Sequence, residues 1–453
     1  MFYRTRQTSV DARLIWAIAL PAMVTNVATA LIGVGDMWIV GQLDDAPTQG
    51  AVDVGARIFA VLFTVMNFLK TGTTGLVAQA GARAGPVEQV ATLLRGLAIA
   101  AVIGFGLLAL RPILLPFLLD ALGAEATVLE AARVYAGIRY WTAPGVMLNL
   151  ALVGYLVGQR RMTTVLVIEV AYNLLNVGLG LWLVLGLGSG IAGIGWSSFV
   201  AEYAKLAVLL GLVAMGPARG HIVDAMHRGG VLSREQLVPF LAINRDLFLR
   251  TVVLMLALAA LTRISAERGA VVLAANGIIY QMFVLTALFL DGFENAAQVI
   301  HGERYGAKDR EGFVSYTTAI LKRGLLGAAI AALGFELFAD PLLASFAATP
   351  EVARTAQDLK LWLVLIPFAG VASFVLDGVF VGASWTRAML LSMAGAAIVY
   401  AAMLWATWPM GSDGLWLSFV VFLAVRAAFQ LALMPRLVAR DLPDASLDGG
   451  RRD

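Results

Sequence analysis

Polar side chains that could bind an ion stand inside long apolar stretches of this sequence. Thr25, Thr29, Gly33 and Asp36 follow one another at intervals of four, four and three residues. This spacing places them on one face of a helix, and no basic residue occurs within one turn of Asp36. A carboxyl group inside an apolar segment is costly and usually functional. We interpret Asp36 as a proton or cation site, with a structural role as the alternative.

A second apolar segment carries the same pattern. Glu169, Asn173, Asn176 and Gly180 also recur at helical intervals on one face. Because both segments are expected to cross a membrane in the same direction, Asn176 and Gly180 should reach a depth near that of Asp36. Asparagines often serve only as helix–helix hydrogen-bond partners, so a structural interpretation of this face stays open.

Two further charge patterns favour structural interpretations. Glu202 and Lys205 are three residues apart, so helical spacing lets them form a local ion pair. His221, Asp224 and His227 also recur every three residues, a pattern that can bind a metal. A solvated loop whose side chains bind no metal explains these three residues better. We therefore predict no metal site and no cofactor beyond a coupling ion.

The second half of the chain gathers its charges elsewhere, at a depth expected in the inner half of a membrane. Four carboxylates and two guanidiniums could form one network with coupled protonation: Arg245, Asp246, Arg250, Asp291, Glu294 and Asp377. From these we predict a polar, substrate-binding site of Asp291, Glu294, Asp377 and Arg250. A purely structural network is the alternative.

Long apolar segments must position all of these residues. A spanning helix needs about 20 apolar residues, and twelve segments qualify: 14–41, 52–80, 93–119, 133–158, 163–187, 191–215, 238–264, 271–301, 316–346, 352–384, 386–410 and 415–437. Hydrophobic residues make up 60% and charged residues 14% of the 453, too apolar for a soluble domain. The predicted fold class is therefore an all-α integral membrane protein.

Composition also limits the partners. The net charge is +3, no basic patch suggests nucleic acid, and the lack of cysteine excludes disulfides and thiolate sites. The polar, basic start of the chain does not resemble a cleavable signal peptide. Basic residues gather on the side that holds both termini and segment 216–237, which predicts cytoplasmic termini.

The chain repeats itself. Gly81 and Gly85 recur as Gly302 and Gly306 at an offset of 221, and a second glycine pair, 154 and 158, recurs at 378 and 382. Two apolar copies of about 220 residues are typical of a duplicated transporter. We predict two pseudo-symmetric six-helix lobes, 1–215 and 238–440, joined by a cytoplasmic loop, 216–237, and followed by a polar tail, 441–453.

Several segments together resemble the multidrug and toxic compound extrusion (MATE) family, in particular its DinF-type bacterial branch. They are Leu20-Pro21 through Gly35-Asp36, Thr73-Thr74-Gly75-Leu76, Ala201-Glu202-Tyr203, Asn244-Arg245-Asp246, Leu290-Asp291-Gly292-Phe293 and Leu376-Asp377-Gly378. The resemblance implies two lobes alternately open to either side of the bacterial inner membrane. It also implies export of organic, often cationic compounds in exchange for H⁺ or Na⁺. We expect the protein to be a monomer.

The resemblance also assigns the ion-coupling residues. A first-helix aspartate couples transport in that family and here is Asp36. An aspartate often joins it from helix five, but Gly180 stands at that position. A sodium site needs several oxygen ligands, whereas a proton needs one carboxylate. We therefore expect H⁺ coupling through Asp36 with Asn173 and Asn176, and with Glu202 as a substitute partner.

A gate follows from the repeat. The offset of 221 pairs Lys70 with Asp291, so opposite charges at equivalent positions could close the cytoplasmic side. In the alternative, Lys70 reaches the lipid headgroups and Asp291 bonds with Arg250.

Three functions compete. The leading one is a proton-coupled exporter of small amphipathic molecules, with membrane lipid as the protein's other expected partner. A flippase for lipid-linked precursors would need many basic residues in its cavity. Here carboxylates dominate beside Lys70, Arg245 and Arg250, which favours cationic or neutral cargo. A membrane enzyme is the distant third, because no catalytic constellation is recognisable.

Overall fold

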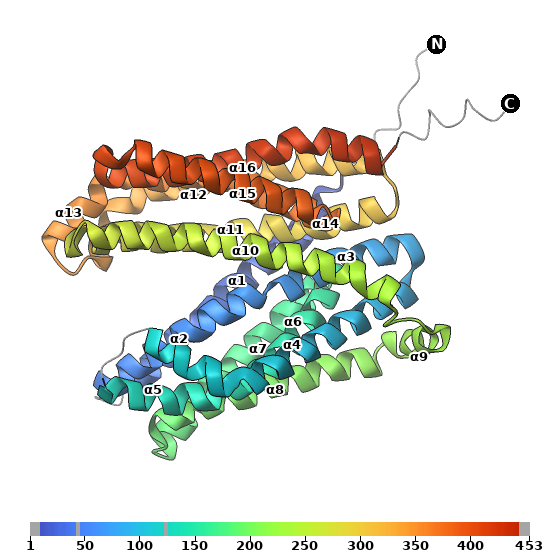
Figure 1. The fold of residues 1–453 in the computed structure, drawn as a ribbon, viewed down its shortest axis with the longest axis horizontal. Coiled ribbons are helices and arrows are strands. Elements are labelled where there is room, and N and C mark those ends of the chain that lie inside the picture. Colours follow the sequence, from blue (N-terminus) through green and yellow to red (C-terminus); the bar gives the residue numbers. More distant parts are fainter. Residues whose placement is uncertain (1–9, 42–45, 122–125, 444–453) are drawn as a thin grey trace, which may run out of the picture. The chain divides into compact units, whose positions relative to one another are not determined.

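The structure is a computed structural model that describes residues 10–41, 46–121 and 126–443. This part of the chain is helical almost throughout (Figure 1). Its first helices are α1 (Ala12–Gly41), α2 (Ala46–Met66), α3 (Phe68–Ala84), α4 (Pro86–Ala121), α5 (Ala126–Arg139), α6 (Ala143–Gly158), α7 (Met162–Leu181), α8 (Gly190–Met215) and α9 (Ala218–Arg228). The later ones are α10 (Arg234–Glu267), α11 (Ala270–Gly306), α12 (Arg310–Phe346), α13 (Pro350–Asp358), α14 (Lys360–Gly382), α15 (Thr386–Ala406) and α16 (Gly411–Asp441).

Twelve helical segments of the described chain are long and apolar enough to cross a membrane. The predicted all-α membrane fold with twelve spans is therefore confirmed. Three of the predicted segments are interrupted. Segment 52–80 breaks at Asn67 between α2 and α3, segment 133–158 at a 3-10 turn (Tyr140–Thr142), and segment 352–384 at Leu359 between α13 and α14.

Local chemistry explains the interruption before α6 and the start of α13. Pro144 lies in the first turn of α6, where a residue without an N–H group is tolerated, whereas in a helix interior it would remove a hydrogen bond. α13 begins with Pro350, and Thr349 caps it by accepting a hydrogen bond from the Val352 N–H at 3.3 Å.

The predicted linker 216–237 is more ordered than a polar loop, because α9 occupies its first half. Gly229 and Gly230 follow α9 with φ angles of 68° and 67°, values that glycine adopts readily and other residues rarely do. They end the helix and turn the chain towards α10.

The helices form two compact units, residues 24–244 and residues 10–23 together with 245–443. These limits differ from the predicted lobe boundaries at the start of α1. There the Trp16 ring lies 5.5 Å from that of Phe293, and the Asp11 N–H donates to the Tyr316 hydroxyl at 3.1 Å. The first turns of α1 therefore belong to the unit built from α10–α16.

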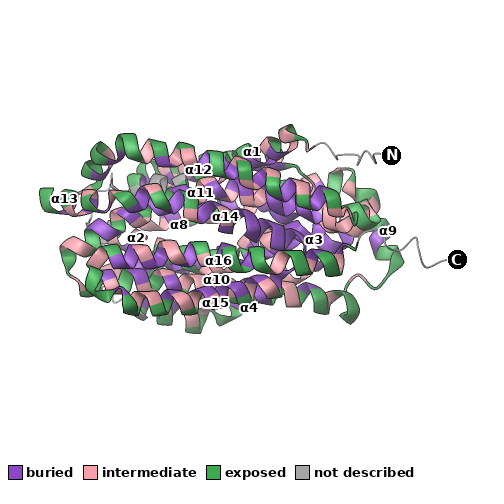
Figure 2. Ribbon diagram, turned by 90° about the horizontal axis from the view of Figure 1, so that it is seen from above, coloured by how far each residue is buried: buried purple, intermediate pink, exposed green. Residues whose placement is uncertain are grey.

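Each unit has its own core. In the unit of α10–α16, α14 is buried along most of its length against α11 and α12, whereas α13 at one end is largely exposed (Figure 2). The apolar cluster of this unit includes Tyr400, Trp416, Phe419 and Phe422. In the other unit, α3, α4 and α6 pack on one another.

The repeated glycines mark equivalent close approaches in the two units. A methyl group on Gly154 would lie 2.6 Å from the Lys70 carbonyl oxygen of α3. A methyl group on Gly378 would meet the Glu294 carbonyl oxygen of α11 in the same way. The counterpart of Lys70 in this packing is therefore Glu294, at an offset of 224. The predicted equivalence of Lys70 with Asp291 is off by three residues, nearly one turn.

This close packing makes Gly158 intolerant of a side chain. The methyl group of Gly158→Ala would lie 2.8 Å from both the Thr74 carbonyl oxygen and the Val77 Cβ, so α3 would have to move. Overpacking of this kind costs about 1–3 kcal/mol, and we expect a lower melting temperature for the purified variant. Gly106→Ala in α4 is the matched control, since its methyl group would meet nothing within 4 Å. Equal melting temperatures would contradict the packing.

Candidate functional site

Asp36 belongs to α1, but the side chains of residues 31–37 lie outside the described part of the chain. Its assignment as the coupling carboxylate therefore stays a prediction. The residues before it are described. Thr25 is buried, and the Thr29 hydroxyl donates to the Thr25 carbonyl oxygen at 2.9 Å.

Asn173 and Asn176 bring α7 against this helix. The Asn173 Nδ2 donates to the Ala28 carbonyl oxygen of α1 at 2.7 Å, which ties the two polar faces together. Its Oδ1 is buried and has no hydrogen-bond partner among the described residues. Asn176, one turn further along α7, is completely buried. Asn173 thus lies in the contact of α7 with α1; a coupling role for either amide stays a prediction.

Gly180 supplies no side-chain ligand where α7 meets Ile39 of α1 and Ser197 of α8. A Cβ on this residue would lie 2.9 Å from Ile39 Cδ1 of α1 and 3.5 Å from Ser197 Oγ of α8. Ile39 is fully buried and stands one turn beyond Asp36. The space beside α7 is therefore filled mainly by an apolar side chain.

The expected local pair between Glu202 and Lys205 is wrong. Lys205 Nζ instead forms an ion pair with Glu169 Oε1 of α7 at 2.6 Å. Glu202 Oε1 accepts a hydrogen bond from Asn149 Nδ2 of α6 at 2.7 Å, and the Glu202 carboxylate also accepts one from Tyr172. Buried charges need well-aligned partners, and neighbouring helices supply them here.

These contacts define a cluster of α6, α7 and α8. The Lys205 ammonium also lies 4.8 Å from the centre of the Tyr172 ring, so Tyr172 contacts both charges of α8. Glu169 and Glu202 are each only 7% exposed. Of the predicted coupling residues, Glu202 is therefore held in this cluster of α6, α7 and α8.

Asp377 is the centre of the polar site in the other unit. It is 1% exposed on α14. Its Oδ2 accepts from Arg250 of α10 and from Arg426 of α16 at 2.5 Å, and its Oδ1 accepts from Gln430 Nε2 at 2.7 Å. Donors from two helices, α10 and α16, thus converge on one carboxylate of α14.

Arg426 and Gln430 are absent from the predicted site. Both are buried, and they are four residues apart in the apolar segment 415–437, a spacing that would have revealed them. Arg426 takes the place expected for Arg245. The Arg245 guanidinium instead binds its neighbour Asp246 at 2.7 Å, and its side chain is 58% exposed.

Glu294 and Asp291 complete this site on α11. The carboxylates of Asp291 and Asp377 and the guanidiniums of Arg250 and Arg426 all act electrostatically on Glu294. These five groups comprise three carboxylates and two guanidiniums. Such a site can accept one proton or one positively charged group.

The proposed gate joins residues of different units. Lys70 is half-buried on α3 and Asp291 half-buried on α11. Their pairing stays a prediction.

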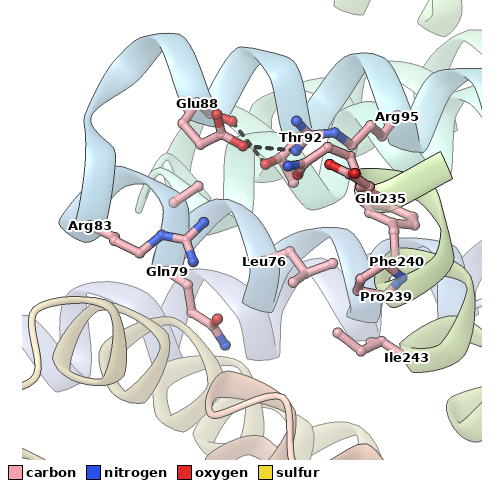
Figure 3. Close-up of a pocket in the computed structure, with 12 residues that line it drawn as sticks. Leu76, Gln79, Arg83, Glu88, Thr92, Arg95, Glu235, Pro239, Phe240 and Ile243 are labelled. Atoms are coloured by element: carbon pink, nitrogen blue, oxygen red, sulfur yellow. Dashed lines mark hydrogen bonds and ion pairs between the residues drawn. The ribbon is translucent and has the colours of Figure 1, made fainter. Parts of the chain in front are cut away.

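A pocket of about 320 Å³ lies apart from these residues, among α3, α4 and the start of α10 (Figure 3). Arg95 contributes to its wall, where its Nη1 binds Glu88 Oε1 at 2.8 Å and its Nε donates to the Val231 carbonyl oxygen at 2.9 Å. Arg83 and Glu235 also line it. Arg95 thereby fixes the connection between α9 and α10 onto α4.

The chain matches the family model described as MatE twice, over residues 21–182 and 247–405. Two matches in one chain agree with the duplication indicated by the glycine motifs.

Individual relatives give the same answer. The chain is 32% identical to the DNA damage-inducible protein F of Escherichia coli (strain K12), over 95% of this chain and 93% of that protein. It is 25% identical to a probable multidrug resistance protein NorM of Caulobacter vibrioides, over 94% and 91%. A solved structure of MATE in the bent conformation superposes with a TM-score of 0.81 at 19% identity, over 94% and 95% of the two chains. The chain therefore belongs to the MatE family of multidrug and toxic compound transporters, and it is a transporter and not an enzyme.

Proposed function

We propose that this protein is an H⁺-coupled antiporter that exports small amphipathic organic compounds by alternating access. Asp36 is the coupling carboxylate, and Asn173 and Asn176 line the contact beside it. Family membership supports export of organic compounds, and relatives of this chain carry names such as multidrug resistance protein. The protein is a multi-pass protein of the inner membrane; we propose cytoplasmic termini and a monomer.

The lack of a side-chain ligand at Gly180 supports the choice of coupling ion. Sodium needs several oxygen ligands, and a second carboxylate beside Asp36 would supply them. The side chain of Ile39 comes within 2.9 Å of the position where such a residue would begin. A proton needs only one carboxyl group, so H⁺ coupling fits a site with a single acid better than Na⁺ coupling.

The charge balance of the second site supports cationic or neutral cargo. Glu294, Asp291 and Asp377 outnumber the guanidiniums of Arg250 and Arg426 by one. A surplus negative charge favours organic cations and disfavours the diphosphates that a flippase must hold.

Ethidium efflux from cells that express the protein tests this proposal. We expect efflux well above that of cells with an empty vector, collapse of that efflux when a protonophore is added, and persistence when an ionophore dissipates only the sodium gradient. Collapse with the sodium ionophore alone would overturn H⁺ coupling. An unchanged ethidium level, together with altered translocation of a lipid-linked precursor, would overturn export and favour the flippase.

A further inference from the structure

Arg111 is an arginine inside the membrane-spanning segment Pro86–Asp120, which belongs to α4. With about 3.6 residues per turn, Arg111 lies between Leu107 and Leu115 on one face of α4, and both leucines are buried. The exposed apolar side chains of this part of α4 lie on the opposite face; they include Val102, Ile113 and Phe117. Arg111 therefore lies on the face that packs against the other helices of its unit.

Aromatic residues surround the guanidinium group of Arg111. Its Cζ lies 5.5 Å from the centre of the Trp141 ring, a distance at which a cation is attracted to the ring. A methyl group on Gly137 of α5 would lie 3.4 Å from its Nη2. Tyr140 and Trp141 both belong to the 3-10 turn that separates α5 from α6. This interruption therefore places two aromatic residues close to one cation.

No carboxylate in the described part of the chain neutralises this cation. Arg111 forms neither an ion pair nor a hydrogen bond with any residue that the structure describes, and its Nε is buried. Tyr140 is also fully buried, and its hydroxyl has no hydrogen-bond partner among the same residues. The charge of Arg111 acts electrostatically on Tyr140, so the two groups are neighbours.

These two groups need a partner. A charged group inside a membrane-spanning segment is costly and usually functional, and a buried donor that makes no hydrogen bond adds a further cost. The buried arginines of the other unit, Arg250 and Arg426, avoid this cost because they share the carboxylate of Asp377. An anionic ligand would play the corresponding role for Arg111 and Tyr140.

The chemistry of the two groups selects the ligand. A guanidinium group presents five N–H donors in a planar fork, which matches the oxygens of a carboxylate or of a phosphate, and the Tyr140 hydroxyl can donate one more hydrogen bond. Trp141 is 48% exposed, so its ring can also contact the apolar part of a ligand. Because Arg111 lies opposite the exposed apolar face of α4, its position favours a free amphipathic carboxylate over the phosphate of a bilayer lipid.

We propose that Arg111 and Tyr140 bind the carboxylate of an amphipathic cargo molecule and that Trp141 packs against its apolar part. This inference rests on the proposed export of small organic compounds and extends their range to carboxylates. A cargo molecule with one carboxylate and one ammonium group is neutral overall. It therefore agrees with the preference for cationic or neutral cargo that was drawn from the site around Asp377.

Calorimetric binding to the purified full-length protein tests this site. The two probes are naphthalene-2-carboxylate and naphthalene-2-carboxamide, which differ in charge but little in size. We expect the parent chain to bind the carboxylate roughly tenfold or more tightly than the carboxamide, as hydrogen bonds to a charged group allow. Arg111→Gln should remove this preference, and Tyr140→Phe should reduce it severalfold. Arg133→Gln replaces an exposed arginine of α5 and, as the matched control, should keep the preference.

Melting temperatures separate binding from folding. Because no described carboxylate neutralises Arg111, Arg111→Gln should melt at or above the temperature of the parent chain. Tyr140→Phe removes only one oxygen atom, so it tests the site even where Arg111→Gln melts early.

Two results would overturn the proposal. Equal affinity of the parent chain and Arg111→Gln for the carboxylate would show that the guanidinium only packs on Trp141. Tighter binding of a short-chain phosphatidate than of the carboxylate, lost in Arg111→Gln, would replace the cargo by a lipid headgroup. If the parent chain prefers the carboxylate but cells that express it show no ethidium efflux, the proposed function fails and the anion site stands.

Discussion

Asp36→Asn is expected to abolish proton-driven efflux and leave the protein folded. Asparagine has the size of aspartate but cannot exchange a proton, so the variant can bind cargo without a coupling ion. Transport driven by a pH gradient in everted vesicles should therefore fall to the level of vesicles without the protein. Because the side chain is replaced by one of nearly equal volume, the melting temperature and folded yield should stay close to those of the parent chain.

Asp53→Asn is the matched control, since Asp53 forms an exposed ion pair with Arg57 at 2.9 Å. Exposed pairs contribute little to stability, and this one lies outside the proposed site, so transport should be unchanged. Undiminished efflux in correctly inserted Asp36→Asn would show that another residue couples transport.

Asp377→Asn is expected to cause the largest loss of stability. The carboxylate lies between Arg250 and Arg426, and its neutralisation leaves two buried guanidiniums facing each other. Removing one partner from a buried ion pair costs about 3–5 kcal/mol. Thermal melting of the purified variant, followed by size-exclusion fluorescence, should show a clear drop. The transport rate per folded molecule should fall as well, because Asp377 belongs to the proposed substrate site.

A second substitution distinguishes a loss of stability from a loss of transport activity. Asp377→Asn combined with Arg426→Gln removes one positive charge and should recover part of the stability without recovering transport. Glu267→Gln breaks an exposed pair with Arg263 and should change neither quantity. If Asp377→Asn lowers only the folded yield and each folded molecule transports at the parent rate, the network is structural.

The membrane fold could be predicted from the sequence because hydrophobic length is a strong local signal. The breaks at Asn67 and Leu359 were not predictable, since short interruptions do not change the apolar character of a long segment. α9 was missed for the opposite reason. Its short amphipathic pattern lies in a polar stretch that length and hydropathy assign to a loop.

The sequence could show which residues belong to the polar sites, but it could not show which residues pair with one another. Asp377 and Arg250 stand out because charges are rare in apolar segments, and the same reasoning applied to segment 415–437 would have found Arg426. The partner of Lys205 depends on how α7 packs against α8, and spacing along one helix cannot supply that. The three-residue error between Lys70 and Asp291 has the same origin. The glycine motif at the helix ends repeats at an offset of 221, whereas the glycines that pack between helices repeat at an offset of 224. The packing decides which residues of the two units are structurally equivalent.

Transport by the purified protein in sodium-free proteoliposomes tests the central claim most directly. A pH gradient of defined size is imposed across vesicles that contain the parent chain or Asp36→Asn, and movement of ethidium is followed. H⁺ coupling predicts that the parent chain moves ethidium against its gradient without sodium, that reversing the pH gradient reverses the direction, and that Asp36→Asn does neither. Transport by the parent chain that begins only when sodium is added would contradict coupling to protons at a single carboxylate.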